Sequence, residues 1–236
     1  MMPQTGMLLA AGLGTRMRPI TDHTPKPLVK VGGKALIDWT LDQLAAANVP
    51  RAVVNVHHLA PLLVAHLKNR KAPAVSISDE TEKLLDTGGG VVKALPLLGL
   101  APFFVFNCDA IIQDGAAPAL ARLAAAWDPT SLDVLMLVHP RECAHGFDGP
   151  GDFFAENDGT LRRRGTAPSA PFVYTGATIL HPRVLADETP IPFSMNKIWD
   201  RAIAAGRMKA VVHDGAWYHV GTPEAVGATD ALLAAS

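Results

Sequence analysis

The sequence lacks the features that place a protein outside the cytoplasm or in a membrane. Its two cysteines, Cys108 and Cys143, form no CxxC pair, so a disulfide framework and a zinc ribbon are disfavoured and a reducing compartment is expected. No apolar run reaches the roughly 18 residues of a spanning helix. The N-terminus also lacks the basic segment of a signal peptide. We therefore expect a cytoplasmic protein with no membrane partner.

Excess charge of either sign is lacking as well. Charged residues make up only 18% of the 236 residues, hydrophobic residues make up 49%, and the formal net charge is −1. A chain of this composition can bury a core and is not disordered. Because the net charge is close to zero, no general electrostatic field attracts nucleic acid or an anionic membrane. Any phosphate ligand must be held by local groups.

The first half of the chain alternates strand-like and helix-like segments. Strands are expected at residues 6–11, 51–56, 74–77, 103–106 and 133–138, and helices at 35–47, 59–67, 90–98 and 118–127. Repeated βα units predict an α/β fold with a mostly parallel, Rossmann-like sheet and helices on both faces. Ligands of such sheets bind at the carboxyl ends of the strands, so the residues directly after each strand are the candidates for a site.

The second half, from about residue 141 to 236, shows a different pattern. Asp158-Gly159 between strand-like runs predicts a hairpin. Further elements are expected as a strand over 172–180, a helix over 195–205, a strand pair at 210–213 and 217–220, and a last helix from Pro223. No linker rich in Gly, Ser or charge separates the halves. We therefore expect a single domain over residues 1–236, with a small β-rich part after about residue 140.

The most informative segment is LAAGLGTRMRPITDHTPKP, from Leu9 to Pro27. Glycines after a buried strand let backbone N–H groups approach an anion closely. Arg16 can grip phosphate oxygens with its fork, and Lys26 adds a point charge. The dinucleotide fingerprint is excluded because Met17 stands where its third glycine should be, and the P-loop spacing is absent. A plain glycine turn with surface basic residues is the alternative, and the full string argues against it.

This string, GxGxRxxPxTxxxPKP, resembles the signature of the sugar-1-phosphate nucleotidyltransferases. The resemblance implies a glycosyltransferase-A-like fold, in which residues 1–140 bind the nucleotide and 141–236 bind the sugar. It implies an enzyme that joins a nucleoside triphosphate to a sugar 1-phosphate and releases pyrophosphate. The nucleotide contacts that it implies are Ala11, Gly12, Gly14, Thr15, Arg16, Lys26, Glu80 and Gly88.

Polar residues that follow later strands complete the expected site. The loop from Asp79 to Gly90 contains three glycines and is either a wall for the nucleobase, as in the family, or a flexible connection. Asp109 follows the fourth strand, where a carboxylate can hold Mg²⁺ or can cap a turn. The resemblance makes Asp109 a metal ligand and a catalytic residue together with Arg16 and Lys26. The sugar contacts that it implies are Asn107, Asp152 and Gly176.

One position departs from the family pattern. The segment that usually reads W-x-D-V-G-T has His219 in place of the expected second metal-binding aspartate. Mg²⁺ prefers oxygen ligands, whereas an imidazole suits Mn²⁺ better. Three outcomes stay open: His219 ligates the metal, it contacts a phosphate or a metal-bound water, or another carboxylate such as Asp214 takes over.

The likeness also indicates a substrate. Within the family, the chain most resembles the short uridylyltransferases that act on N-acetylmuramic acid 1-phosphate in cell-wall recycling, through the LLxTGGG loop, the GDF segment and the run from Pro25 to Ile37. A guanylyltransferase for mannose or heptose 1-phosphate is the alternative. A non-catalytic nucleotide-binding protein is the alternative of another class. The expected partners are these small molecules and no nucleic acid, and the expected assembly is a monomer or a weak dimer.

Overall fold

A parallel core forms the middle of the central sheet. In the computed structural model, which describes residues 1–235, β1 (Thr5–Leu9) lies between β6 (Phe103–Asn107) and β4 (Arg51–Val56), and β5 (Ala74–Asp79) lies beyond β4. All of these pairings are parallel. The interiors of β1, β4 and β6 are buried, which is why they read as apolar runs in the sequence. The parallel sheet predicted for the first half is confirmed.

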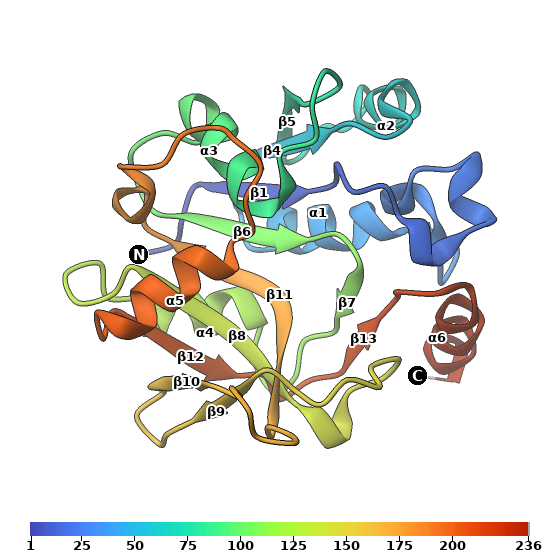
Figure 1. Ribbon diagram of the computed structural model, residues 1–236. Helices are drawn as coiled ribbons and strands as arrows, with labels where there is room; N and C mark the ends of the chain where they lie inside the picture. The colour runs from blue at the N-terminus through green and yellow to red at the C-terminus, as the bar shows by residue number, and fades with distance from the viewer. Residues whose placement is uncertain (236) are drawn as a thin grey trace.

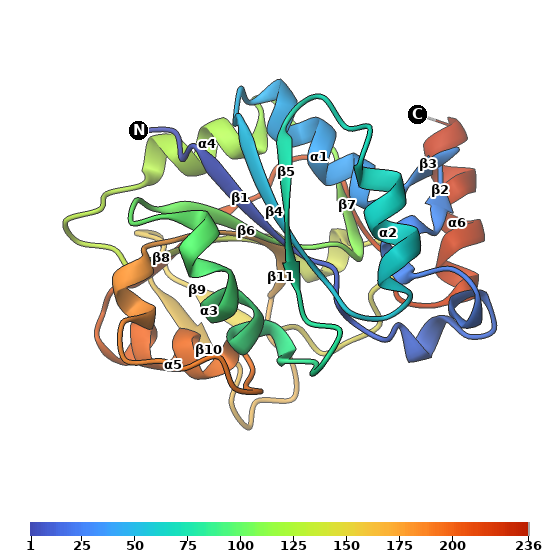
Figure 2. The ribbon, with the colours of Figure 1, turned by 90° about the horizontal axis from the view of Figure 1, so that it is seen from above.

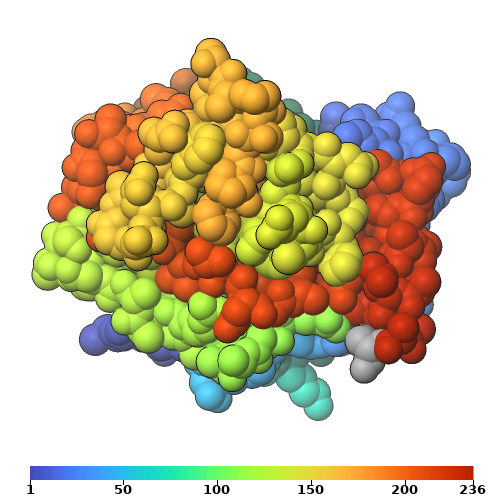
Figure 3. Space-filling model, turned by 90° about the horizontal axis from the view of Figure 1, so that it is seen from below, coloured from blue at the N-terminus to red at the C-terminus, as the bar shows by residue number. Residues whose placement is uncertain are grey.

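Beyond β6 the sheet becomes mixed. β11 (Phe172–Leu180) pairs antiparallel with both β6 and β8 (Val134–Pro140), and β12 (Met208–Val212) pairs parallel with β8. The predicted hairpin forms from β9 (Phe153–Ala155) and β10 (Leu161–Arg163), beside the start of β11. Figure 3 shows the yellow residues of this region gathered on the lower face, next to red residues of the C-terminal segments. The two halves of the chain therefore share one sheet.

Helices cover both faces of this sheet (Figures 1 and 2). One face packs against α1 (Leu36–Ala46), α2 (Ala60–Leu67) and α4 (Ala119–Ala126), whose apolar residues join one core cluster. The other face packs against α3 (Asp86–Leu98) and α5 (Asn196–Ala204), which contribute to a second cluster. No helix within residues 1–235 combines the length and the apolar character needed to cross a bilayer.

A third, smaller cluster joins the two ends of the chain. The short hairpin of β2 (Lys30–Val31) and β3 (Lys34–Ala35) lies beside α6 (Pro223–Ala235) (Figure 2). Val31, Met17 and Val220 are buried together there. The segment that follows the glycine loop, residues 12–14, is thus packed against the C-terminal part of the chain.

Two predictions about elements are wrong in detail. The strands near residues 210–213 and 217–220 do not pair with each other, because β12 occupies the free edge of β8. β13 (Trp217–His219) instead pairs antiparallel with β7 (Ala110–Ile112), a short strand that continues the chain past β6. The helix predicted to begin at Gly90 begins at Asp86, so all three glycines of that segment lie inside α3.

Candidate active site

The carboxyl ends of β1, β4 and β6 open into a cavity of about 390 Å³. This is the edge of a parallel sheet at which ligands are expected to bind. Its walls come from the glycine loop, from Lys26, from Asn55 at the end of β4, from the start of α3, and from the turn after β6. Of the residues expected from the sequence, those that line it are Ala11, Gly12, Gly14, Thr15, Arg16, Lys26, Asn107 and Asp109.

The glycine loop, residues 12–14, carries backbone N–H groups without protein acceptors in the described part of the chain, and Gly12 and Gly14 line this cavity. The N–H groups of Gly12, Leu13 and Gly14 have no hydrogen-bond acceptor within residues 1–235. Gly14 has φ of 63°, and a Cβ there would lie 2.9 Å from the Thr21 side chain, so glycine is required. The Thr21 hydroxyl donates to the Gly14 carbonyl over 2.8 Å, which fixes the loop from behind. Successive free N–H groups of this kind form a concave anion site.

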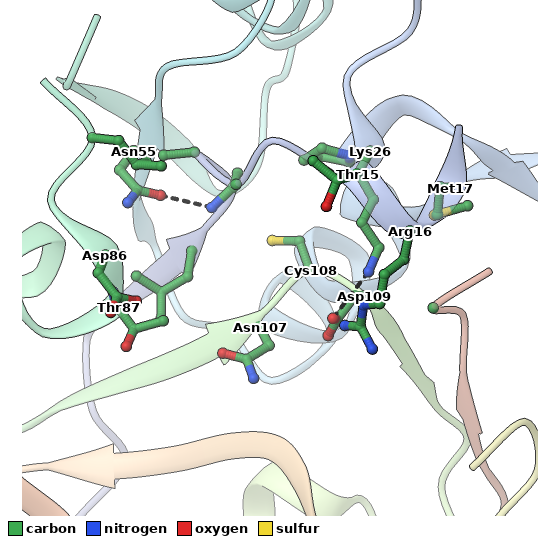
Figure 4. A pocket seen from close by; sticks show the side chains of 18 residues that line it. Thr15, Arg16, Met17, Lys26, Asn55, Asp86, Thr87, Asn107, Cys108 and Asp109 are labelled. Carbon is green, nitrogen blue, oxygen red and sulfur yellow. Dashed lines mark hydrogen bonds and ion pairs between the residues drawn. The ribbon is translucent and has the colours of Figure 1, made fainter. Parts of the chain in front are cut away.

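Cations and one carboxylate converge at the same end of the cavity (Figure 4). The Lys26 ammonium lies 3.0 Å from an Asp109 carboxylate oxygen, and the two side chains are 13% and 28% exposed. Arg16 lines the cavity beside them and makes no ion pair within residues 1–235. Burial raises the pKa of Asp109, but Lys26, His219 and Arg16 together lower it more, so the pKa lies below its usual value. Asp109 is therefore ionised at neutral pH.

His219 faces Asp109 from the β7–β13 ribbon. The ribbon pairs His219 with Ala110, and the Val220 N–H donates to the Asp109 carbonyl over 2.8 Å. The His219 Nε2 atom lies 3.9 Å from the Asp109 carboxylate, and Nδ1 lies 3.2 Å from the Gly146 carbonyl. Nδ1 therefore faces the Gly146 carbonyl, which turns Nε2 towards the Asp109 side. Asp214, the alternative, lies elsewhere and pairs with Arg122 over 2.5 Å.

The end of the cavity opposite Lys26 and Asp109 has no cationic side chain among its lining residues within residues 1–235. Asn55, Thr87 and Asp86, at the left of Figure 4, line it together with Leu84. The sequence reasoning missed Asn55 and Thr87. A signal for Asn55 was present, because it is the polar residue of the otherwise apolar run that forms the end of β4.

Glu80 and Gly88 do not line this cavity. Glu80 is fully buried and accepts hydrogen bonds from Asn55 Nδ2 and the Leu85 N–H, over 2.7 and 3.0 Å. The Gly88 N–H donates to the Phe193 carbonyl over 2.8 Å, and a Cβ at Gly88 would overlap the Phe193 ring. Both residues therefore contact protein groups next to the residues that line the cavity, Asn55 and Thr87, and not the cavity itself.

Two of the three residues expected to contact a sugar also lie outside the cavity lining. Gly176 has φ of 94° and packs against Asn107, since a Cβ there would lie 3.1 Å from the Asn107 Cβ. The Asp152 carboxylate accepts the Tyr174 N–H over 2.9 Å. Both residues thus shape the strand β11 next to Asn107, which does line the cavity.

The comparisons with known proteins agree with this geometry. The nucleotidyl transferase family profile matches residues 5–147. A protein of Caulobacter vibrioides, N-acetylmuramate alpha-1-phosphate uridylyltransferase, is 48% identical over 236 residues, covering 98% of each chain. This chain belongs to the nucleotidyl transferase family. The expectation of a nucleotidyltransferase, drawn from the glycine-rich string, is confirmed.

Further similarities support this assignment to the nucleotidyl transferases. N-acetylmuramate alpha-1-phosphate uridylyltransferase of Neisseria meningitidis is 32% identical over 219 residues, covering 92% of each chain. The fold matches a putative glucose-1-phosphate thymidylyltransferase from Bacillus anthracis with a TM-score of 0.79 and 17% identity, covering 97% of this chain and 94% of that one. The glycosyltransferase-A-like fold that was expected is therefore present.

Proposed function

We propose that this nucleotidyl transferase joins UTP to N-acetylmuramic acid 1-phosphate, forming UDP-N-acetylmuramic acid and pyrophosphate. The observation that carries the proposal is the single cavity in which Arg16, Lys26 and Asp109 converge beside free loop N–H groups. The choice of uridine and of the muramic sugar rests on the 48% identity to the Caulobacter protein over nearly the whole chain. We further propose that the enzyme works in the cytoplasm, in cell-wall recycling.

The proposed chemistry is one in-line displacement at phosphorus. An oxygen of the sugar 1-phosphate forms a bond to the α-phosphorus of UTP, and the bond from that phosphorus to the pyrophosphate oxygen breaks. The attacking oxygen is already anionic, so no general base is required. Catalysis is then mainly positioning and neutralisation of charge. Gly12 and Gly14 cradle the phosphates, Arg16 stabilises charge on the leaving pyrophosphate, and Lys26 reduces repulsion between the two anions.

The residues present also fit a divalent metal ion. No cluster of three or more His, Cys, Asp or Glu suited to a metal exists within residues 1–235, so the protein offers at most Asp109 and His219. Mg²⁺ is commonly bound by one or two protein ligands plus substrate phosphates, which matches this small donor set. When bound there, the ion would polarise phosphoryl oxygens and neutralise their charge. Asn107, which lines the cavity beside Asp109, is the proposed contact for the sugar.

The first test measures pyrophosphate release with UTP and N-acetylmuramic acid 1-phosphate. We expect Asp109→Asn and Lys26→Ala each to lower kcat about a hundredfold, as loss of one charge contact to the transition state does. Asp158→Asn is the matched control, because Asp158 is exposed and pairs only with Lys209 and Thr160 on the surface. Near-normal turnover of both active-site variants would refute the assigned roles.

The second test identifies the substrates. Each common nucleoside triphosphate is combined with muramic, glucosamine, mannose and heptose 1-phosphates, with Mg²⁺ and then with Mn²⁺. We expect the highest kcat/KM for UTP with the muramic sugar. Preference for GTP with mannose or heptose 1-phosphate would replace this substrate with the guanylyltransferase alternative. Binding of UTP without pyrophosphate release, for every sugar, would indicate a non-catalytic nucleotide-binding protein.

A further inference from the structure

A chain of buried hydrogen bonds runs behind the end of the cavity that is opposite Lys26 and Asp109. The Ala10 N–H donates to Asn55 Oδ1 over 2.6 Å, and Asn55 Nδ2 donates to Glu80 Oε1 over 2.7 Å. The second oxygen of Glu80 accepts the Leu85 N–H over 3.0 Å. We call this chain, from Ala10 through Asn55 and Glu80 to Leu85, the Glu80 relay. It joins the end of β1, the end of β4 and the start of α3.

The burial of the relay means that its groups must satisfy one another. Asn55 is 2% exposed and Glu80 is 0% exposed. Glu80 accepts one hydrogen bond on each of its two carboxyl oxygens, from Asn55 Nδ2 and from the Leu85 N–H. It therefore forces Asn55 to present its NH₂ group to Glu80 and its carbonyl oxygen to Ala10. A reversed Asn55 amide would place two acceptors together at Glu80 and two donors together at Ala10.

The segments that the relay joins form one wall of the cavity. Ala10, Asn55, Leu84, Asp86 and Thr87 all line it, while Glu80 lies behind them. Figure 4 shows Asn55, Asp86 and Thr87 at one end, and Arg16, Lys26 and Asp109 at the other. A nucleotide with its phosphates at the cationic end must place its nucleoside against the wall that the relay holds. This step rests on the proposed function.

We propose that Glu80 and the relay are a positioning device for the nucleoside half of the substrate. Glu80 does not touch the nucleotide. It fixes Asn55, and through Asn55 and Leu85 it sets the backbone of the wall against which the base and ribose lie. A side chain that aligns the wall in this way affects nucleotide affinity and base selectivity. It leaves the reacting phosphates and the sugar 1-phosphate site unchanged.

Glu80→Gln is the sharpest test, because the side chain keeps its size and loses one of its two acceptors. The variant leaves one buried donor at Glu80 without an acceptor and so misaligns the wall. We therefore expect the Kd of UTP, measured by calorimetry, to rise about tenfold, which corresponds to about 1.4 kcal/mol. The KM for UTP should rise in parallel, and its advantage over other nucleoside triphosphates should fall. The kcat at saturating UTP, the KM for the sugar 1-phosphate and the inhibition constant of pyrophosphate should change by less than about twofold.

A second variant disturbs the relay without removing any of its groups. A Cβ at Gly90, on α3, would lie 2.7 Å from Glu80 Oε1 and 2.8 Å from Asn55 Nδ2. Gly90→Ala should therefore shift the relay, while the helix itself gains a better helix-forming residue. We expect the same selective loss of UTP affinity. This variant keeps the proposal testable if Glu80→Gln does not fold.

Asp133→Asn is the matched control. Asp133 is another buried carboxylate, 9% exposed, but it pairs with Arg183 and Arg207 at the start of β8, away from the cavity. It should lower the thermal stability without a selective change in UTP affinity. UTP affinity within twofold of the unaltered chain in both relay variants would overturn the proposal. Equal weakening of UTP and pyrophosphate would overturn it too, since it would indicate general disruption.

The unaltered chain separates this proposal from the proposed function. If it binds UTP but releases no pyrophosphate with any sugar 1-phosphate, the enzymatic function fails, and the relay is still judged by the Kd values of the variants. If it binds no nucleotide at all, both proposals fail.

Discussion

At the scale of single residues, the site consists of a few charges whose states depend on one another. Lys26 and Asp109 form an ion pair over 3.0 Å, and His219 Nε2 stands 3.9 Å from the same carboxylate. The three residues come from distant parts of the sequence. A divalent metal ion at this end would meet a carboxylate beside an imidazole, and we expect the imidazole to influence which ion the site prefers.

The residue to change is therefore His219. If its imidazole ligates the metal, His219→Asp should shift the preference from Mn²⁺ towards Mg²⁺, because a carboxylate oxygen suits Mg²⁺ better than nitrogen does. The measurements are the concentrations of each ion that half-saturate activity, and direct binding of Mn²⁺ by electron paramagnetic resonance. An unchanged ratio of the two concentrations, with unchanged Mn²⁺ binding, would show that His219 is not a ligand.

Much of the site could be predicted because it is local in sequence. Gly12, Gly14, Arg16 and Lys26 belong to one string, and the chemistry of phosphate binding selects those residue types. Their convergence with Asp109 on one cavity is observed, whereas their individual roles stay predictions. The position of Gly88 could not be foreseen, because it depends on a partner far along the chain, and that of Glu80 could not because its buried carboxyl group is held by Asn55 and Leu85 only once β4 and α3 have packed together. Phe193, the partner of Gly88, lies more than a hundred residues later.

At the scale of elements, the start of α3 shows how a distant segment can override helix propensity. Three consecutive glycines are poor helix formers, and the sequence therefore predicted a loop up to Gly90. In the structure they let the segment from Ile191 to Phe193 lie directly on the first turn of α3. A Cβ at Gly89 would collide with the Ile191 carbonyl, and the Phe193 carbonyl accepts the Gly88 and Gly89 N–H groups. These contacts stabilise a helix that its own residues do not favour.

The same substitution in two helices should consequently have opposite effects. Gly89→Ala should lower the free energy of unfolding by about 1 to 3 kcal/mol, because the added methyl group forces the backbone near Ile191 to move. Gly227→Ala in α6 should raise it by about 0.5 to 1 kcal/mol, because a Cβ there meets nothing within 4 Å. Urea unfolding of both variants measures the difference. A stabilising effect at Gly89 would contradict the packing argument.

At the scale of the whole molecule, the antiparallel strand β11 and the parallel strand β12 extend the sheet of the first half into the second. The sequence predicted the parallel part well, because repeated βα units have few possible arrangements. Its pairing of the strands at 210–213 and 217–220 with each other is wrong, since short strands carry little information about their partners. Two histidines, His139 on β8 and His213 after β12, are buried where these strands meet, 2% and 1% exposed.

Acid should destabilise the protein through these buried histidines. Burial lowers the pKa of both His139 and His213 below the ordinary value of 6.5. Below pH 6.5 the unfolded chain binds protons that the native chain does not, so the free energy of unfolding falls as the pH falls. The slope is at most about 1.4 kcal/mol per pH unit for each histidine.

Urea midpoints between pH 7.5 and pH 5 measure this dependence. His213→Gln keeps an N–H donor for the Gln113 carbonyl, which His213 contacts over 3.0 Å, and removes the titration. It should therefore reduce the slope. A slope as steep as that of the unaltered chain would show that the acid sensitivity arises elsewhere.

The ribbon of β7 and β13 also has a consequence for how the protein is made. It holds His219 beside Asp109, although one residue leaves the ribosome long after the other. A nascent chain therefore carries the glycine loop, Lys26 and Asp109 while β7 still lacks its pairing strand. The growing polypeptide therefore has the glycine loop, Lys26 and Asp109 in place long before the His219 side chain joins them.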